Sequence, residues 1–233
     1  MTTAELASKI DHTILKPEAA APEVHKVVAE AAQCRFASAC VSPAWVAKTV
    51  TQLRGSGVLT CTVVGFPHGT SKPIHKAIEA TGLIKDGAHE IDVVAHLPHL
   101  AAGHLDAARE ELREIARACR AARRDVVIKV IIESAYLMGL GPDRGEQAIA
   151  TACRAVRESG CDFVKTSTGF HSAGGATVEA VRLMKKYAEG LLVKAAGGIR
   201  DLTTARAMLA AGADRLGMSA SVAVLKELEE QGG

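Results

Sequence analysis

Five charged residues interrupt apolar segments whose composition is otherwise typical of buried strands. They are Asp11 in KIDHTIL, Asp92 in EIDVV, Lys129 in VVIKVII, Lys165 in DFVKTSTG and Lys194 in LLVKAAGG. Burying a charge is unfavourable unless a partner compensates it, so charges in such segments are informative. Any one of them, taken alone, could form a structural ion pair or face outward toward a covering helix.

Taken together, the three lysines and two carboxylates leave one amine without a carboxylate partner. Burial and a neighbouring ammonium group both favour the neutral form of an amine, so we expect its pKa to be lowered. A neutral amine is the species that attacks a carbonyl carbon to form a Schiff base. The set therefore predicts carbonyl chemistry, provided that the fold brings the five residues to one place.

The elements that must position these residues alternate along the chain. Runs such as CTVVGF and VVIKVIIE are too continuous for a sheet with one wet face, and they predict strands covered on both sides, as in parallel sheets. Strands are expected at residues 9–15, 37–41, 59–65, 90–95, 126–133, 162–167, 191–196 and 215–218.

Amphipathic segments separate the strands. The first carries Val24, Val27, Val28 and Ala31 at helical spacing, which makes one apolar face. Glycine follows several of these segments, as expected for a helix C-cap. Helices are expected at residues 22–33, 72–85, 105–123, 143–158, 177–189, 202–211 and 219–230, with a short one over 4–8.

This repeating order predicts an α/β fold, a (β/α)8 TIM barrel that occupies residues 1–233 as a single domain. A doubly wound open sheet is the alternative, because a local pattern does not establish closure of the sheet. In a barrel the active site lies at the carboxyl ends of the strands, where the five charges would converge.

Composition argues against several other classes of protein. The 28 basic and 26 acidic residues give a net charge of +2, which creates no field for nucleic acid or a membrane surface. The N-terminus has no signal-peptide pattern, and no run approaches the roughly 18–20 apolar residues of a membrane span. The six cysteines are scattered without a C-x-x-C pair, which indicates reduced thiols in the cytoplasm. The nine histidines follow no metal-ligand spacing, so no metal is expected.

Seven segments occur in the order of the motifs of deoxyribose-phosphate aldolases. They are IDHTILKP (10–17), ACVSP (39–43), VVGFPHG (63–69), EIDVV (90–94), KVIIES (129–134), FVKTSTGF (163–170) and VKAAGGIR (193–200). The chain thus resembles this family of class I, Schiff-base aldolases over nearly its whole length, and the last two motifs are the most specific. The resemblance implies a (β/α)8 barrel with neither a metal nor an organic cofactor.

The resemblance also implies a reaction and its catalytic residues. Lys165 would form the Schiff base, Lys194 would keep that amine neutral and relay protons, and Asp92 would orient water and Lys194. The reaction would be the reversible cleavage of 2-deoxy-D-ribose 5-phosphate to D-glyceraldehyde 3-phosphate and acetaldehyde. Small sugar phosphates and aldehydes would be the only partners besides a second copy of the chain in a homodimer.

The implied substrate-binding residues lie mainly at the ends of the later strands. Loops after the last two strands of a barrel, beside a helix N-terminus, commonly bind phosphate. The set is Asp11, Thr13, Lys129, Thr166, Gly169, Gly197, Gly198, Gly217 and Ser219. The glycine pair could instead serve only a tight turn.

Three segments of the sequence depart from the family's pattern, at five positions in all. GMSAS (217–221) stands where many members read G-T-S-S-G, and His96 and Ser42 stand where asparagine is frequent.

Two alternative functions remain open at this point. One is another Schiff-base sugar-phosphate aldolase, of the transaldolase or ketose-phosphate kind, and the other is a non-catalytic barrel that binds phosphate sugars.

Overall fold

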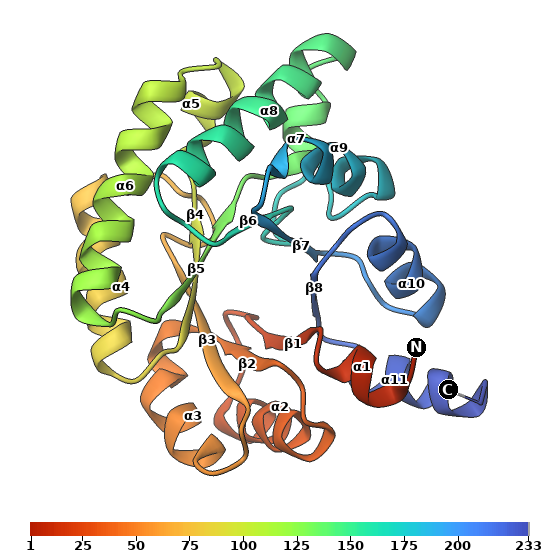
Figure 1. Cartoon of the computed structure of the whole chain (residues 1–233). Coiled ribbons are helices and arrows are strands. Elements are labelled where there is room, and N and C mark those ends of the chain that lie inside the picture. Colours follow the sequence, from red (N-terminus) through yellow and green to blue (C-terminus); the bar gives the residue numbers. More distant parts are fainter. Residues whose placement is uncertain (233) are drawn as a thin grey trace.

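Eight parallel strands close into a barrel in the computed structural model, which describes residues 1–232 (Figure 1). The strands are β1 (Ile10–Ile14), β2 (Ser38–Val41), β3 (Leu59–Val64), β4 (Glu90–Val94), β5 (Val127–Ile131), β6 (Phe163–Lys165), β7 (Leu192–Ala196) and β8 (Arg215–Met218). β1 pairs with both β2 and β8, which closes the sheet. The single-domain TIM barrel is therefore confirmed, and the open-sheet alternative is wrong.

Helices surround the strands as an outer layer, and the two ends of the chain lie close together (Figure 1). The main helices are α2 (Ala21–Cys34), α3 (Val46–Leu53), α4 (Pro73–Lys85), α6 (Leu105–Ala122), α8 (Pro142–Glu158), α9 (Val178–Ala188), α10 (Leu202–Ala210) and α11 (Ser221–Glu230). Short helical elements are α1 (Thr3–Ala7), η1 (Pro43–Trp45), α5 (Leu97–Ala101) and α7 (Ser134–Met138). α1 begins at a capping box, in which Thr2 accepts a hydrogen bond from the Glu5 amide and Glu5 accepts one from the Thr2 amide.

The structure contains three α-helices that the sequence analysis does not predict, α3, α5 and α7, and it places the start of α11 later than expected. α3 is not predicted by the sequence, because its β-branched residues Thr49, Val50 and Thr51 have low helix propensity. Burial of Val46 and Leu53 against the barrel outweighs that preference. α11 begins at Ser221 instead of Ser219, which leaves Ser219 and Ala220 in the loop after β8.

The register of the strands brings the charged residues together. Asp92 on β4 lies beside Lys129 on β5, and Lys165 on β6 lies beside Lys194 on β7. Lys194 is in turn level with Arg215 on β8. Partners in a parallel register point their side chains to the same side of the sheet, so these residues face the barrel interior together.

The apolar core lies between the strands and the helices. Ile91 and Val93, which flank Asp92 on β4, are fully buried within it, whereas Asp92 points into the barrel. This alternation explains how a charge fits in a strand with two apolar neighbours. Within residues 1–232, no helix combines the length and the apolar character that crossing a membrane requires.

Candidate active site

The carboxylate of Asp92 lies at the centre of a buried ionic network. Its Oδ2 atom accepts hydrogen bonds from Lys165 Nζ and Lys194 Nζ, each at 2.7 Å. Its Oδ1 atom accepts one from Lys129 Nζ at 2.8 Å. The three predicted catalytic residues therefore meet at one carboxylate.

A second tier of charges joins this network. Asp11 accepts a hydrogen bond from Arg215 at 2.5 Å, and its other oxygen lies 2.5 Å from Lys194 Nζ and 3.5 Å from Lys129 Nζ. Glu90 accepts from Lys129 at 2.5 Å and lies 3.4 Å from Arg215. Four cationic side chains thus share three carboxylates, which leaves one surplus positive charge.

Glu90 and Arg215 were not among the five charges that the sequence singles out, although signals for both exist. Glu90 precedes Asp92 by two residues in EIDVV, so the two side chains face the same side of the strand. Arg215 opens the last strand and lies in register with Lys194. The expectation that one amine lacks a carboxylate partner is wrong, because Lys129, Lys165 and Lys194 all contact Asp92; the surplus positive charge belongs to the network as a whole.

Opposing effects set the pKa values in the network. Burial acts to raise the pKa of Asp92, but the ammonium groups of Lys129, Lys165 and Lys194 outweigh it and hold that pKa well below its usual range. Burial acts to lower the pKa of Lys194, but the carboxylates of Asp11 and Asp92 outweigh it and raise that pKa. Asp92 is therefore held as a carboxylate and Lys194 as an ammonium ion.

The lowered pKa values of Asp92 and Asp11 predict how stability depends on pH. A carboxylate whose pKa is lower in the folded state stabilises the fold above its unfolded pKa of about 3.9, and this contribution is lost as the pH falls toward the folded pKa. We expect the free energy of unfolding in urea to stay level down to about pH 5 and to decrease below about pH 4. The Asp92→Asn variant should show a shallower acid slope, and an identical slope in both proteins would contradict this prediction.

Lys165 is the member of the network that borders a cavity of about 590 Å³ at the carboxyl ends of the strands. Five predicted substrate-binding residues border the same cavity: Thr13, Gly197, Gly198, Gly217 and Ser219. Gly169 lies between Thr168 and Phe170, which both line the wall. The predicted residues around Lys165 therefore form one concave site.

Besides Gly169, three predicted substrate-binding residues do not line the cavity. Asp11 and Lys129 are fully buried in the ionic network. Thr166 is also buried, and its hydroxyl donates to the Ala196 carbonyl at 3.0 Å and accepts from the Ala196 amide at 2.9 Å. The Thr166 hydroxyl group thus links the end of β6 to β7 beside Lys165, and its role in this structure is structural.

The loops after β7 and β8 have the features of an anion site. Gly197 and Gly198 have φ values of 90° and 84°, a left-handed conformation that glycine adopts without steric cost. Ser219 and Ala220 border the cavity directly before α11, whose N-terminus carries the positive end of the helix dipole. Arg200 also lines the cavity, and its position two residues after the Gly197-Gly198 pair is the signal that could have found it.

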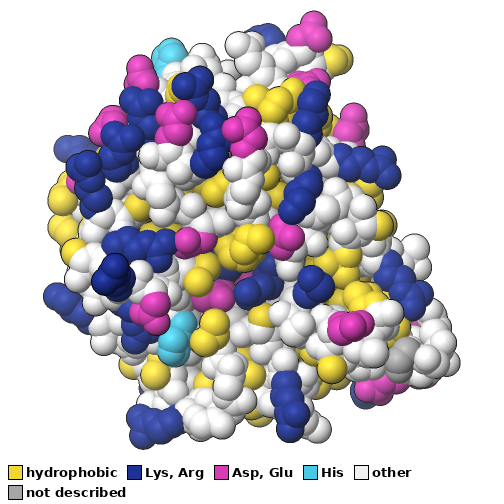
Figure 2. Space-filling model, in the orientation of Figure 1, with side chains coloured by type: hydrophobic (Ala, Val, Ile, Leu, Met, Phe, Trp, Pro, Cys, Tyr) yellow, Lys and Arg dark blue, Asp and Glu magenta, His cyan; other side chains and the backbone are white. Residues whose placement is uncertain are grey.

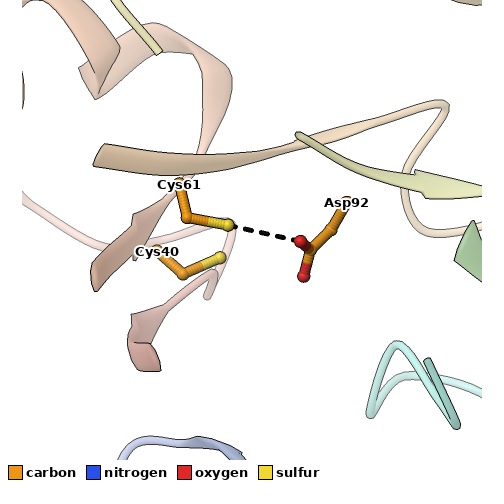
Figure 3. A group of neighbouring side chains, drawn as sticks. All are labelled: Cys40, Cys61 and Asp92. Carbon is orange, nitrogen blue, oxygen red and sulfur yellow. Dashed lines mark hydrogen bonds between the residues drawn. The ribbon is translucent and has the colours of Figure 1, made fainter. Parts of the chain in front are cut away.

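Two thiols lie beside the network on neighbouring strands. Cys40 on β2 and Cys61 on β3 are in register, and Cys61 Sγ lies 3.3 Å from Asp92 Oδ1 (Figure 3). These three residues are close enough to surround a metal ion. However, burial raises the pKa of the Cys61 thiol, and the carboxylate is already shared by three ammonium groups that would repel a cation. Cys40 and Cys61 therefore pack against the ionic network, and they are poorly suited to bind a metal ion together with Asp92.

A closed eight-stranded barrel with a charged network under a cavity at the carboxyl ends of its strands defines a (β/α)8-barrel enzyme. The chain belongs to the DeoC/LacD family of aldolases, whose model matches residues 6–227.

Similar proteins include curated and structurally characterised aldolases. The chain is 43% identical over 228 residues to the deoxyribose-phosphate aldolase of Caldanaerobacter subterraneus subsp. tengcongensis, covering 97% of this chain and 95% of the relative. It is 46% identical to the deoxyribose-phosphate aldolase of Mycobacterium ulcerans, covering 97% of this chain and 96% of the relative. The tetrameric deoxyribose phosphate aldolase of Aeropyrum pernix superposes with a TM-score of 0.88 at 33% identity, covering 99% of this chain and 93% of that one.

Proposed function

We propose that this aldolase cleaves 2-deoxy-D-ribose 5-phosphate reversibly to D-glyceraldehyde 3-phosphate and acetaldehyde through a Schiff base on Lys165. The observation that carries the proposal is the position of Lys165, whose amine contacts Asp92 while the residue borders the cavity. The names of the similar proteins support the choice of substrate.

In the proposed mechanism the neutral amine of Lys165 adds to the C1 aldehyde of the open-chain sugar, and loss of water gives an iminium ion. The C2–C3 bond then breaks, its electron pair moves into the iminium to form an enamine, and a base removes the proton of the C3 hydroxyl group. Glyceraldehyde 3-phosphate leaves. Protonation of the enamine at C2 and hydrolysis release acetaldehyde and restore the amine.

Asp92 and Lys194 would serve these proton transfers. Asp92 Oδ2 contacts both lysine amines, so it is placed to orient a water molecule between them. The raised pKa of Lys194 favours a fixed positive charge at that position over the proton relay implied by the resemblance.

Borohydride trapping tests the covalent step directly. Acetaldehyde with borohydride should add one ethyl group to the chain, on the peptide that contains Lys165, as measured by mass spectrometry. A non-catalytic phosphate-sugar barrel would remain unmodified. Trapping by dihydroxyacetone instead of acetaldehyde would favour the ketose-phosphate aldolase alternative.

The phosphate group should bind between the amides of Gly198 and Ser219, opposite the N-terminus of α11. Amides donate regardless of the side chain, so the hydroxyl groups missing from GMSAS should weaken this site without removing it. We expect a higher kcat/KM for 2-deoxyribose 5-phosphate than for 2-deoxyribose. Ser219→Glu should remove this preference by like-charge repulsion, with Ser219→Gln as the neutral control. Equal values for the two sugars in the wild type would contradict the assignment of the site.

Self-association and cytoplasmic location also belong to the proposal. Ile74 and Ile78 lie one turn apart on α4 and are 49% and 64% exposed. Contact with a second copy of the chain would bury these apolar side chains, which supports a homodimer. Light scattering should then give about twice the chain mass of 24.3 kDa. The scattered cysteines support a reducing compartment, the cytoplasm.

A further inference from the structure

His12 is a buried titratable residue that the proposed mechanism does not use. It lies between Asp11 and Thr13 on β1, and strand alternation turns its side chain toward the helices while theirs face the barrel interior. The residue is only 1% exposed. Its Nδ1 atom lies 2.9 Å from Ser221 Oγ, and its Nε2 atom lies 2.9 Å from Glu30 Oε2.

The hydrogen bonds around His12 engage both of its ring nitrogens. Nδ1 shares a hydrogen bond with Ser221 Oγ, which also contacts the Met218 carbonyl at 3.1 Å at the end of β8. An ionised Glu30 can only accept, so Nε2 must donate to it. The His12 ring thus bridges the first residue of α11 and the Glu30 carboxylate, with one ring nitrogen bonded to each.

Both partners of His12 belong to the end of the cavity assigned to phosphate. Ser221 is the first residue of α11, and the N-cap residue Ala220 provides no side-chain cap. Glu30 lines the cavity wall from α2. An uncompensated carboxylate there would repel a phosphate. Lys26 lies 3.9 Å from the other Glu30 oxygen, but its side chain is 76% exposed and contributes little.

We propose that His12 is a positioning residue for the phosphate end of the cavity. It fixes the first turn of α11 against the barrel through Ser221, and it holds the Glu30 carboxylate in the cavity wall by a hydrogen bond. His12 itself does not border the cavity and touches no reacting atom. The inference rests on the proposed function, because it assumes that the substrate carries a phosphate.

Two substitutions separate the contacts of His12. In His12→Asn the amide nitrogen takes the place of Nδ1 and keeps the bond to Ser221 while losing Glu30, whereas in His12→Gln it takes the place of Nε2 and keeps Glu30. We expect each of the two variants to raise KM for 2-deoxyribose 5-phosphate about tenfold, which is the size of effect expected when a hydrogen bond to a charged group is lost. The value of kcat should change less than about twofold. Values of kcat/KM for unphosphorylated 2-deoxyribose should stay within about twofold.

Double and single variants complete the experiment. Adding Glu30→Gln to His12→Asn removes the uncompensated charge and should recover part of the lost affinity. Ser221→Ala removes the hydrogen bond between His12 and Ser221 from the Ser221 side and should also raise KM for the phosphorylated sugar. It therefore replaces any His12 variant that does not fold. His25→Asn, at an exposed histidine of α2, is the matched control.

Each result decides a different question. Folded His12 and Ser221 variants that keep the wild-type KM for the phosphorylated sugar would overturn the inference, and so would an equal loss on both sugars, which indicates a merely structural role. A wild type that shows no preference for the phosphorylated sugar would overturn the proposed phosphate site and the inference with it. Wild-type preference with unchanged variants would overturn the inference alone.

Discussion

Replacing Lys165 with alanine should decrease retro-aldol turnover on the order of 10⁴-fold or more, because no other group is placed to form the iminium ion. The fold should persist. The variant removes the surplus positive charge and leaves three cationic side chains with three carboxylates. Initial rates with 2-deoxyribose 5-phosphate and thermal denaturation measure the two effects.

Lys85→Ala is the control for this variant, since Lys85 is an exposed lysine at the end of α4. It should keep full turnover and full trapping by borohydride. A folded Lys165→Ala protein that retains more than about one per cent of wild-type turnover would show that another residue is the nucleophile.

Replacing Asp92 with asparagine should impair both stability and turnover. Four cationic side chains would then share two carboxylates, and breaking a buried ion pair in this way costs about 3–5 kcal/mol. Loss of the carboxylate that contacts both lysine amines should also decrease kcat by about 10³-fold, within the range for proton-transfer groups. Urea denaturation and steady-state kinetics measure the two quantities.

Asp11→Asn provides the matched comparison. Asp11 is equally buried and contacts Lys129 and Lys194, but not Lys165. It should destabilise the fold to a similar extent and decrease kcat much less. Equal losses of kcat in the two variants would mean that Asp92 acts only by holding the network together.

Much of the fold can be predicted from the sequence, because strands and helices depend on residues that are close together in the chain. Strands such as β3 and β5 are continuous β-branched runs that require cover on both faces, so they predict a parallel sheet without any tertiary information. α6 and α8 have one apolar and one charged face, which predicts helices packed on that sheet. The position of Lys165 inside an apolar run is visible for the same reason, because an uncompensated charge in a buried strand is unfavourable.

The sequence by itself therefore determined the order of the elements and the five buried charges, since both depend on neighbours in the chain. Only the tertiary structure decided the closure of β1 against β8 and the meeting of Lys129, Lys165 and Lys194 at one oxygen pair of Asp92. It also decided that Thr166 bonds to the neighbouring strand and does not border the cavity. These features depend on the register between strands and on burial, which arise from contacts between residues far apart in the chain and have no local signal.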